Sequence, residues 1–206
     1  KPFIHKEVEM FNQIENNYID SRSPSAVLDF SKLVLEHIEN KIENREEIII
    51  FCIGTDRSTG DALGPLVGSK LEPYISSYKN VHLIGTLDEP VHAKNLNDKI
   101  DYLENYFDNP LVIAIDASLG NTDKIGYINI KSGSLKPGLG VNKILPEGGD
   151  ISITGVVNVA GIMEYLVLQN TRLSLVMNMA DVIARSINIA LFRLSTNIIK
   201  RGTKSI

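Results

Sequence analysis

The sequence has no tryptophan and a single cysteine, Cys52, among its 206 residues. One cysteine cannot form a disulfide framework within the chain or a zinc site built from several thiolates. Cys52 lies inside the apolar run 48–53, a position that favours a buried, inert thiol over a catalytic nucleophile. A reducing, cytoplasmic setting fits this composition.

Long apolar runs and basic stripes are also missing. The most apolar stretch, 156–168, is interrupted by Asn158, Gly161 and Glu164, and it falls short of the ~18 residues that a membrane-spanning helix needs. The first seven residues do not form a secretory signal segment. Lys and Arg do not gather with aromatic residues, as they do in nucleic-acid-binding proteins. We therefore expect neither a membrane nor a nucleic acid as partner.

The net charge of −4 is concentrated at one end of the chain. Residues 1–47 carry ten acidic and six basic residues, whereas acids and bases balance over the remainder. The overall composition, 43% hydrophobic and 22% charged, is that of an ordinary globular protein. The length fits one domain, and we expect a single α/β domain over 1–206 with an N-terminal helical arm at 1–46 and a core at 47–195.

The apolar spacing predicts the elements of that domain. Steps of three and four residues indicate helices at 6–19 and 24–44 in the arm. In the core, the pattern predicts strands at 48–53, 81–84, 111–115, 127–130 and 151–153. It also predicts a helix that begins at 64, a second that begins at 95, a third that ends near 169 and a last helix over 172–194. A Gly- and Pro-rich loop covers 132–150. Strands that alternate with helices favour a three-layer fold, a mostly parallel twisted sheet with helices on both faces.

In such sheets, ligands bind outside the carboxyl ends of the strands. Asp116 ends the strand at 111–115, and Asp61 follows the strand at 48–53 just before a helix. Two carboxylates in one cleft can share a proton and activate water, or they can bind a hard cation through oxygen. Each acid also has a structural interpretation, Asp61 as an acid that stabilises a helix start and Asp116 as a cap at a strand end. Because the fold brings the two together, we favour function.

Other side chains at the same edge are candidates for binding substrate. Asp56 and Thr59 lie in the loop that leads to Asp61, Asn142 lies in the Gly-rich loop, and His92 follows the second strand. His92 could carry a proton or bind a metal, although a lone loop histidine is more often a surface residue. The segment 54–61 is not a phosphate loop, because no Gly-Lys-Ser/Thr follows and an acid comes after Gly60. Gly-x-Ser-x-Gly is absent as well.

Four segments in order resemble the spore germination protease, an endopeptidase that degrades small acid-soluble spore proteins. They are Gly60-Asp61-Ala62-Leu63-Gly64-Pro65, Val112-Ile113-Ala114-Ile115-Asp116-Ala117, Pro137-Gly138-Leu139-Gly140-Val141-Asn142-Lys143 and Thr154-Gly155-Val156-Val157. The whole chain is similar to the YyaC-like sporulation proteins related to that protease, through 54–61 and 87–93. The fold resembles that of hydrogenase maturation endopeptidases, which bind a metal through acids and a later histidine, but no histidine follows His92.

The resemblance implies that Asp61 and Asp116 match the two functional aspartates of the protease. It favours a sporulation protein that hydrolyses peptide bonds of a spore protein, in the cytoplasm of a sporulating cell or inside the spore, with no cofactor required. One alternative is a non-catalytic protein of the same fold that binds a peptide or partner. Another is a divalent-cation site in which Asp61 and Asp116 are ligands, with Asp56 beside them.

Overall fold

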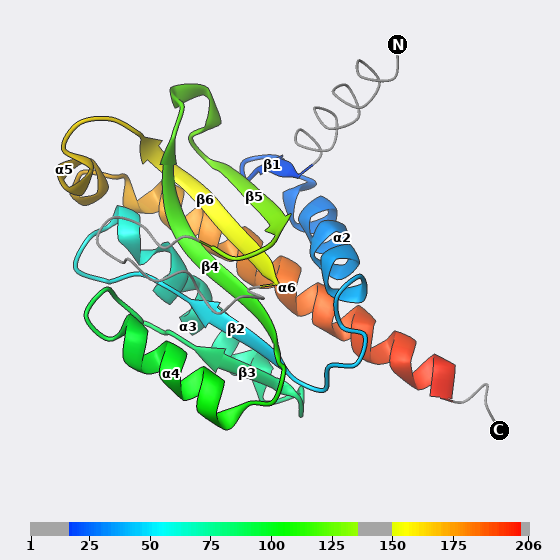
Figure 1. The fold of residues 1–206 in the computed structure, drawn as a ribbon. Helices are drawn as coiled ribbons and strands as arrows, with labels where there is room; N and C mark the ends of the chain where they lie inside the picture. The colour runs from blue at the N-terminus through cyan, green and yellow to red at the C-terminus, as the bar shows by residue number, and fades with distance from the viewer. Residues whose placement is uncertain (1–16, 136–149, 203–206) are drawn as a thin grey trace, which may run out of the picture.

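Six strands form one sheet in the computed structural model, which describes residues 17–135 and 150–202. They are β1 (Tyr18–Asp20), β2 (Ile48–Cys52), β3 (Val81–Ile84), β4 (Leu111–Gly120), β5 (Tyr127–Ser132) and β6 (Ile151–Val159). Their order across the sheet is β1-β5-β6-β4-β2-β3 (Figure 1). The pairings among β3, β2, β4 and β6 are parallel, and those that join β5 to β6 and to β1 are antiparallel. The predicted mostly parallel sheet is confirmed.

Helices cover both faces of the sheet, as the alternation of strands and helices predicted (Figure 1). The helices are α2 (Ala26–Glu39), α3 (Leu63–Ile75), α4 (Leu96–Tyr106), α5 (Glu164–Gln169) and α6 (Leu173–Gly202), with short 3-10 turns η1 (Gly60–Ala62) and η2 (Thr122–Lys124). α2, α3 and α6 pack on one face, and α4 packs on the other.

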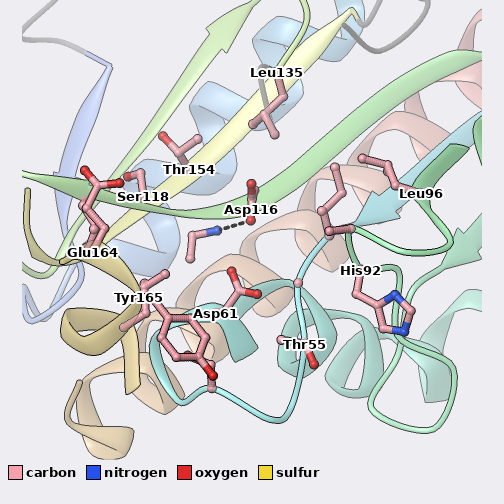
Figure 2. A pocket seen from close by; sticks show the side chains of 17 residues that line it. Thr55, Asp61, His92, Leu96, Asp116, Ser118, Leu135, Thr154, Glu164 and Tyr165 are labelled. Atoms are coloured by element: carbon pink, nitrogen blue, oxygen red, sulfur yellow. Dashed lines mark hydrogen bonds between the residues drawn. The ribbon is translucent and has the colours of Figure 1, made fainter. Parts of the chain in front are cut away.

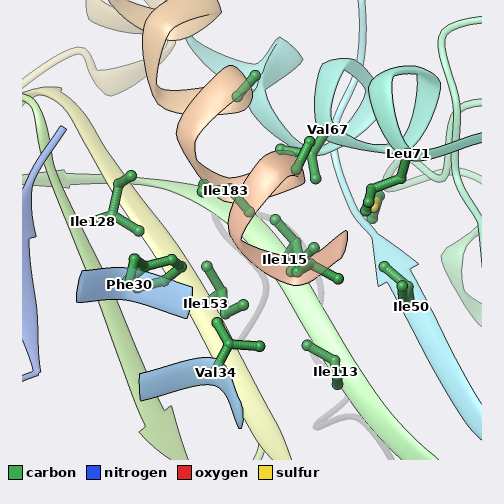
Figure 3. Close-up of a cluster of buried hydrophobic side chains, with 14 of the residues drawn as sticks. Phe30, Val34, Ile50, Val67, Leu71, Ile113, Ile115, Ile128, Ile153 and Ile183 are labelled. Carbon is green, nitrogen blue, oxygen red and sulfur yellow. The ribbon is translucent and has the colours of Figure 1, made fainter. Parts of the chain in front are cut away.

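Alternate residues of the two central strands point into different layers of the core. Ile113 and Ile115 of β4 belong to the larger cluster, shared with α2, α3 and α6 (Figure 3). Val112 and Ala114 belong to the smaller cluster, shared with α4. A strand that is buried on both faces needs an uninterrupted apolar sequence, which explains the β-branched run at 48–53. The same alternation directs Asp116 to the α4 side of the sheet.

The long helix α6 is the central core helix of the larger layer. By length and apolar composition alone, Leu173–Thr196 could cross a membrane, with a mean hydropathy of 1.4 in its most apolar window. However, 56% of that window is buried inside the fold, where Val176, Ile183 and Ile187 pack in the larger cluster. The core helix of a globular fold passes the same test, so this composition is weak evidence for a membrane span.

The N-terminal arm differs from the sequence prediction. Residues 18 and 19 were expected at the end of a helix over 6–19. Instead, Tyr18–Asp20 form β1 at the edge of the sheet, because β5 offers antiparallel backbone partners and Ile19 packs on the core. Residues 6–16 of that predicted helix lie outside the described residues. The second predicted helix, 24–44, is shorter at both ends, and Asn44 has a left-handed backbone (φ 61°) that a helix excludes.

The length of β6 is the second difference from the sequence prediction, and it changes which residues reach the site. The prediction ended this strand at 153 and started a helix soon after, whereas β6 runs to Val159 and α5 has six residues. Gly155 lies within β6. A Cβ atom at this position would lie 2.5 Å from Cδ2 of Leu63 and 2.6 Å from Cε of Met179, so the glycine lets α3 and α6 pack close to the strand.

A close backbone approach fixes where the site begins. Gly64 lies at the start of α3, and a Cβ atom there would lie 2.1 Å from the carbonyl oxygen of Ile53. The contact is with backbone, which cannot rotate away. Gly64 therefore sets the distance between the end of β2 and the turn that carries Asp61.

We predict that Gly64→Ala destabilises the protein by about 1–3 kcal/mol, the usual cost of overpacking a rigid site. In a thermal melt this corresponds to a fall in Tm of roughly 2–4 °C per kcal/mol. Gly161→Ala is the matched control, because nothing lies within 4 Å of the Cβ position there. Equal Tm values for the two variants would contradict the close approach.

Candidate active site

A pocket of about 430 Å³ opens at the carboxyl ends of β2 and β4. Its lining combines apolar side chains such as Leu96 and Leu168 with acidic and hydroxyl groups. Ligands of open α/β sheets bind at this position, outside the carboxyl ends of the strands. The predicted location of the site therefore coincides with a real cavity among the described residues.

Asp61 enters this pocket from the loop that follows β2. The loop closes on itself, because the Thr55 N–H donates to the carbonyl oxygen of Asp61 at 3.0 Å. Gly54 permits the closure with a left-handed φ of 144°, and a Cβ atom there would lie 2.0 Å from the same carbonyl oxygen. The local sequence thus holds Asp61 at the mouth of β2.

The environment of Asp61 favours its protonated form. Desolvation by burial raises the pKa of the Asp61 carboxyl above its ordinary value, and a backbone hydrogen bond at Thr55 lowers it by less. A carboxyl group that keeps its proton more readily than usual is suited to act as an acid.

Asp116 enters the pocket from β4 and is 5% exposed. Its Oδ1 accepts a hydrogen bond of 2.8 Å from the N–H of Ala117. Thr154 lies beside it on β6, directly opposite in the parallel register, and also lines the pocket. An acceptor held by a backbone N–H suits an ionised carboxylate.

Figure 2 shows the Asp61 and Asp116 side chains as neighbours that project into the same space. Their backbones lie on different elements, one in η1 and the other within β4. The predicted convergence of the two carboxyl groups is thus present in the geometry, and their catalytic role stays a prediction.

The other predicted residues are distributed unevenly around this pair. His92 lines the pocket, and its Nδ1 is buried without a hydrogen-bond partner among the described residues. Val91 forms an isolated parallel bridge with Ile53, and its carbonyl oxygen accepts a hydrogen bond of 2.8 Å from the Gly54 N–H, which brings His92 to the end of β2. Asp56 is exposed, and neither Asp56 nor Thr59 is among the residues that line the pocket. Asn142 lies outside the described residues.

Sequence reasoning missed the two lining residues that α5 contributes. Glu164 and Tyr165 come from α5, which reaches the pocket only because β6 continues to Val159 (Figure 2). Ser58 lines the pocket from the loop after β2, and its Oγ is buried without a partner among the described residues. Ser58 lies three residues before Asp61, in the polar segment that the sequence analysis placed after this strand.

Asp61 and Asp116 are the residues that could hold a cation here. Within residues 17–135 and 150–202, no group of three or more His, Cys, Asp or Glu side chains is arranged to hold a metal ion. A divalent cation would thus take two protein carboxylates and draw its other oxygen ligands from water or substrate. The cation site stays a prediction.

Comparison with known proteins identifies the family. Residues 18–186 match the family described as "Protein of unknown function (DUF1256)". The chain belongs to the DUF1256 family. Its sequence is 56% identical, over 142 residues, to the protein YyaC of Bacillus subtilis (strain 168), described as uncharacterized; the match covers 69% of this chain and 68% of that protein. This confirms the predicted membership of the YyaC-like group.

A solved structure shares part of the architecture. The [NiFe] hydrogenase maturation protease HycI of Thermococcus kodakarensis KOD1 superposes with a TM-score of 0.49 at 19% identity, covering 75% of this chain and 97% of that one. The α/β fold stands on the strands and helices described above.

The raised pKa of Asp61 predicts a pH-dependent effect of Asp61→Asn on stability. The folded state binds the proton more tightly than the unfolded state, so the carboxyl costs stability once pH rises through the folded pKa, and costs nothing below the ordinary value of 3.8. We expect the Tm of the variant to exceed that of the native protein at pH 7, and the two values to converge near pH 3.

The matched control is Asp98→Asn, which changes an exposed carboxylate on α4. The difference in Tm between this variant and the native protein should vary less with pH than that of Asp61→Asn. A lower Tm for Asp61→Asn at pH 7 would show that the ionised carboxylate stabilises the fold, contrary to the desolvation argument.

Proposed function

We propose that this DUF1256 protein hydrolyses a peptide bond with water, using Asp61 as the acid and Asp116 as the base. The observation that carries the proposal is the shared pocket, in which two carboxyl groups from different elements face one space at the carboxyl ends of the strands. Pairs of titratable groups in unlike environments take unlike roles. Desolvation favours the protonated form of Asp61, and the Ala117 N–H suits ionised Asp116.

The chemistry balances with these two groups alone. Asp116 takes a proton from water as the water oxygen bonds to the peptide carbonyl carbon, and Asp61 gives its proton to the carbonyl oxygen. Asp116 then passes its proton to the leaving nitrogen as the C–N bond breaks. Asp61 recovers a proton from the hydroxyl group that becomes the new carboxyl. Both side chains return to their starting states.

The finer parts of the proposal come from the resemblance to the germination protease. The substrate is a spore protein, and the setting is the cytoplasm of a sporulating cell or the spore interior. Thr59 and Asn142 belong to the proposal as residues that orient substrate or water, with Asp56 and His92 as further substrate contacts. Of these, His92 has support from its position in the pocket wall.

We expect Asp61→Asn and Asp116→Asn each to lower the rate of peptide hydrolysis by about 10²–10⁴-fold, the usual contribution of a general acid or base. The assay incubates the pure protein with extracted spore proteins and follows fragments by mass spectrometry. Circular dichroism checks that both variants fold.

Asp98→Asn is the control for activity, because it makes the same chemical change on α4 away from the pocket lining. It should cleave at the native rate. Unchanged turnover in both pocket variants would reject the mechanism. Binding of spore proteins without fragments from the native protein would favour the non-catalytic binding protein instead.

A further inference from the structure

β4 continues past the strand that pairs with it on one side. β2 pairs with β4 from Ile48 opposite Leu111 to Cys52 opposite Ile115, and the N–H of Ile53 donates to the carbonyl of Ile115 at 2.7 Å. β4 then extends to Gly120, and within the described residues β6 is the strand that pairs with it there. Over 117–120, no strand of the described chain pairs with the β2 side of β4.

The backbone direction along β4 shows which groups face that open side. In a strand, the N–H and C=O of successive residues point alternately to the two neighbours. The carbonyl of Ile115 points to the β2 side, so those of Ala117 and Leu119 do as well. Gly120 fits the alternation, because its carbonyl accepts from the N–H of Ala160 beyond β6. Ala117 and Leu119 both line the pocket.

The Ala117 N–H already donates to Asp116. Within the described residues, the carbonyl of Ala117 and both backbone groups of Leu119 have no partner on this side, so these groups can bond to a ligand. They form a short strand edge inside the pocket, next to the proposed base. An open edge of this kind is a template for pairing with an extended chain.

A side chain in the pocket independently calls for a ligand. Ser58 is 7% exposed, and its Oγ has no hydrogen-bond partner among the described residues. A buried hydroxyl without a partner costs stability in the free protein. Such a group is explained when a ligand supplies the missing bond. Ser58 belongs to the same pocket lining as Ala117 and Leu119.

We propose that the DUF1256 pocket binds an extended peptide as an added strand along Ala117–Leu119 of β4, with Ser58 Oγ as a further hydrogen-bond partner. The peptide takes the place that β2 vacates after Cys52, so its backbone passes Asp116 at the start of the open edge. Leu119, Leu168 and Tyr165 in the lining suit apolar side chains of the bound segment. This inference names how the substrate binds and rests on the proposed function only for the position of the cleaved bond.

Backbone methylation tests the strand addition. The probe is a fluorescein-labelled hexapeptide of alternating Thr and Val, residues that favour extended backbone. Two derivatives carry N-methyl groups on all Val residues or on all Thr residues. Binding is measured by fluorescence anisotropy with the full-length Asp61→Asn variant. Because alternate N–H groups face β4, we expect one derivative to lose at least about tenfold in affinity and the other to bind like the parent.

Equal affinity of the two derivatives, or no binding of the unmethylated hexapeptide, would overturn the strand addition. The result is independent of catalysis. If only one methylated derivative loses affinity and the native protein hydrolyses no peptide, the strand addition stands and the proposed reaction is wrong. If the native protein hydrolyses peptides and the two derivatives bind equally, the proposed reaction stands and the strand addition is wrong.

Ser58→Ala tests the hydroxyl. We expect affinity for the unmethylated hexapeptide to fall about three- to tenfold, the value of one hydrogen bond, while Tm stays level or rises because an unpaired buried group is gone. Ser186→Ala is the matched control: Ser186 is also buried, but its Oγ donates to the carbonyl of Val27 at 3.0 Å. It should lower Tm and leave affinity unchanged. Native affinity for Ser58→Ala, or a loss of Tm like that of the control, would overturn the role of Ser58.

Discussion

The burial of β2 and β4 on both faces is the constraint on which the rest of the structure depends. Every residue of β2 is buried, and β4 is buried from Leu111 to Asp116. Apolar side chains on both faces leave polar groups only at the strand ends. Because the two strands are parallel and in register, their carboxyl ends meet at one edge of the sheet. Asp61, in the turn after β2, and Asp116, on β4 just past the last residue that pairs with β2, are brought together at this edge.

Glycines allow the close contacts that fix the positions of the elements around the pocket. Gly54 and Gly64 bring the loop around Asp61 against the end of β2, each through a contact that a Cβ atom would block. Gly155 does the same for β6 by admitting Leu63 and Met179. The contacts at Gly54 and Gly64 are with backbone atoms, which cannot move away cheaply, so packing fixes the loop that carries Asp61. The pocket is accordingly preformed, as an acid–base pair requires.

The pocket combines two properties that suit the proposed hydrolysis of a peptide bond. Burial raises the pKa of the Asp61 carboxyl, which suits this group to the proposed role of acid. The extra length of β4 leaves a strand edge beside them. An extended main chain is the ligand that a strand edge selects, and its amide is the bond that an acid and a base can hydrolyse. The chain belongs to the DUF1256 family, and the proposed chemistry rests on these local features.

Much of the fold could be predicted from the sequence. The run 48–53 and the segment 111–115 are strands because continuous β-branched residues suit a doubly buried position, and the layers follow from their alternation with helices. Asp61 and Asp116 were predictable as site residues because each comes after such a run. What failed were elements whose local pattern was ambiguous. The end of the predicted helix at 6–19 is an edge strand, since β5 supplies partners that periodicity cannot reveal.

The sequence by itself determined the buried strands and the acids that follow them, because hydrophobic periodicity and polar strand ends are local properties. Only the tertiary structure decided that β6 runs to Val159, so that Glu164 and Tyr165 line the pocket. It also decided that the Oγ of Ser58 has no hydrogen-bond partner among the described residues, and that β4 extends beyond the end of β2. These features depend on strand register and on contacts between residues distant in the chain. No local pattern encodes them.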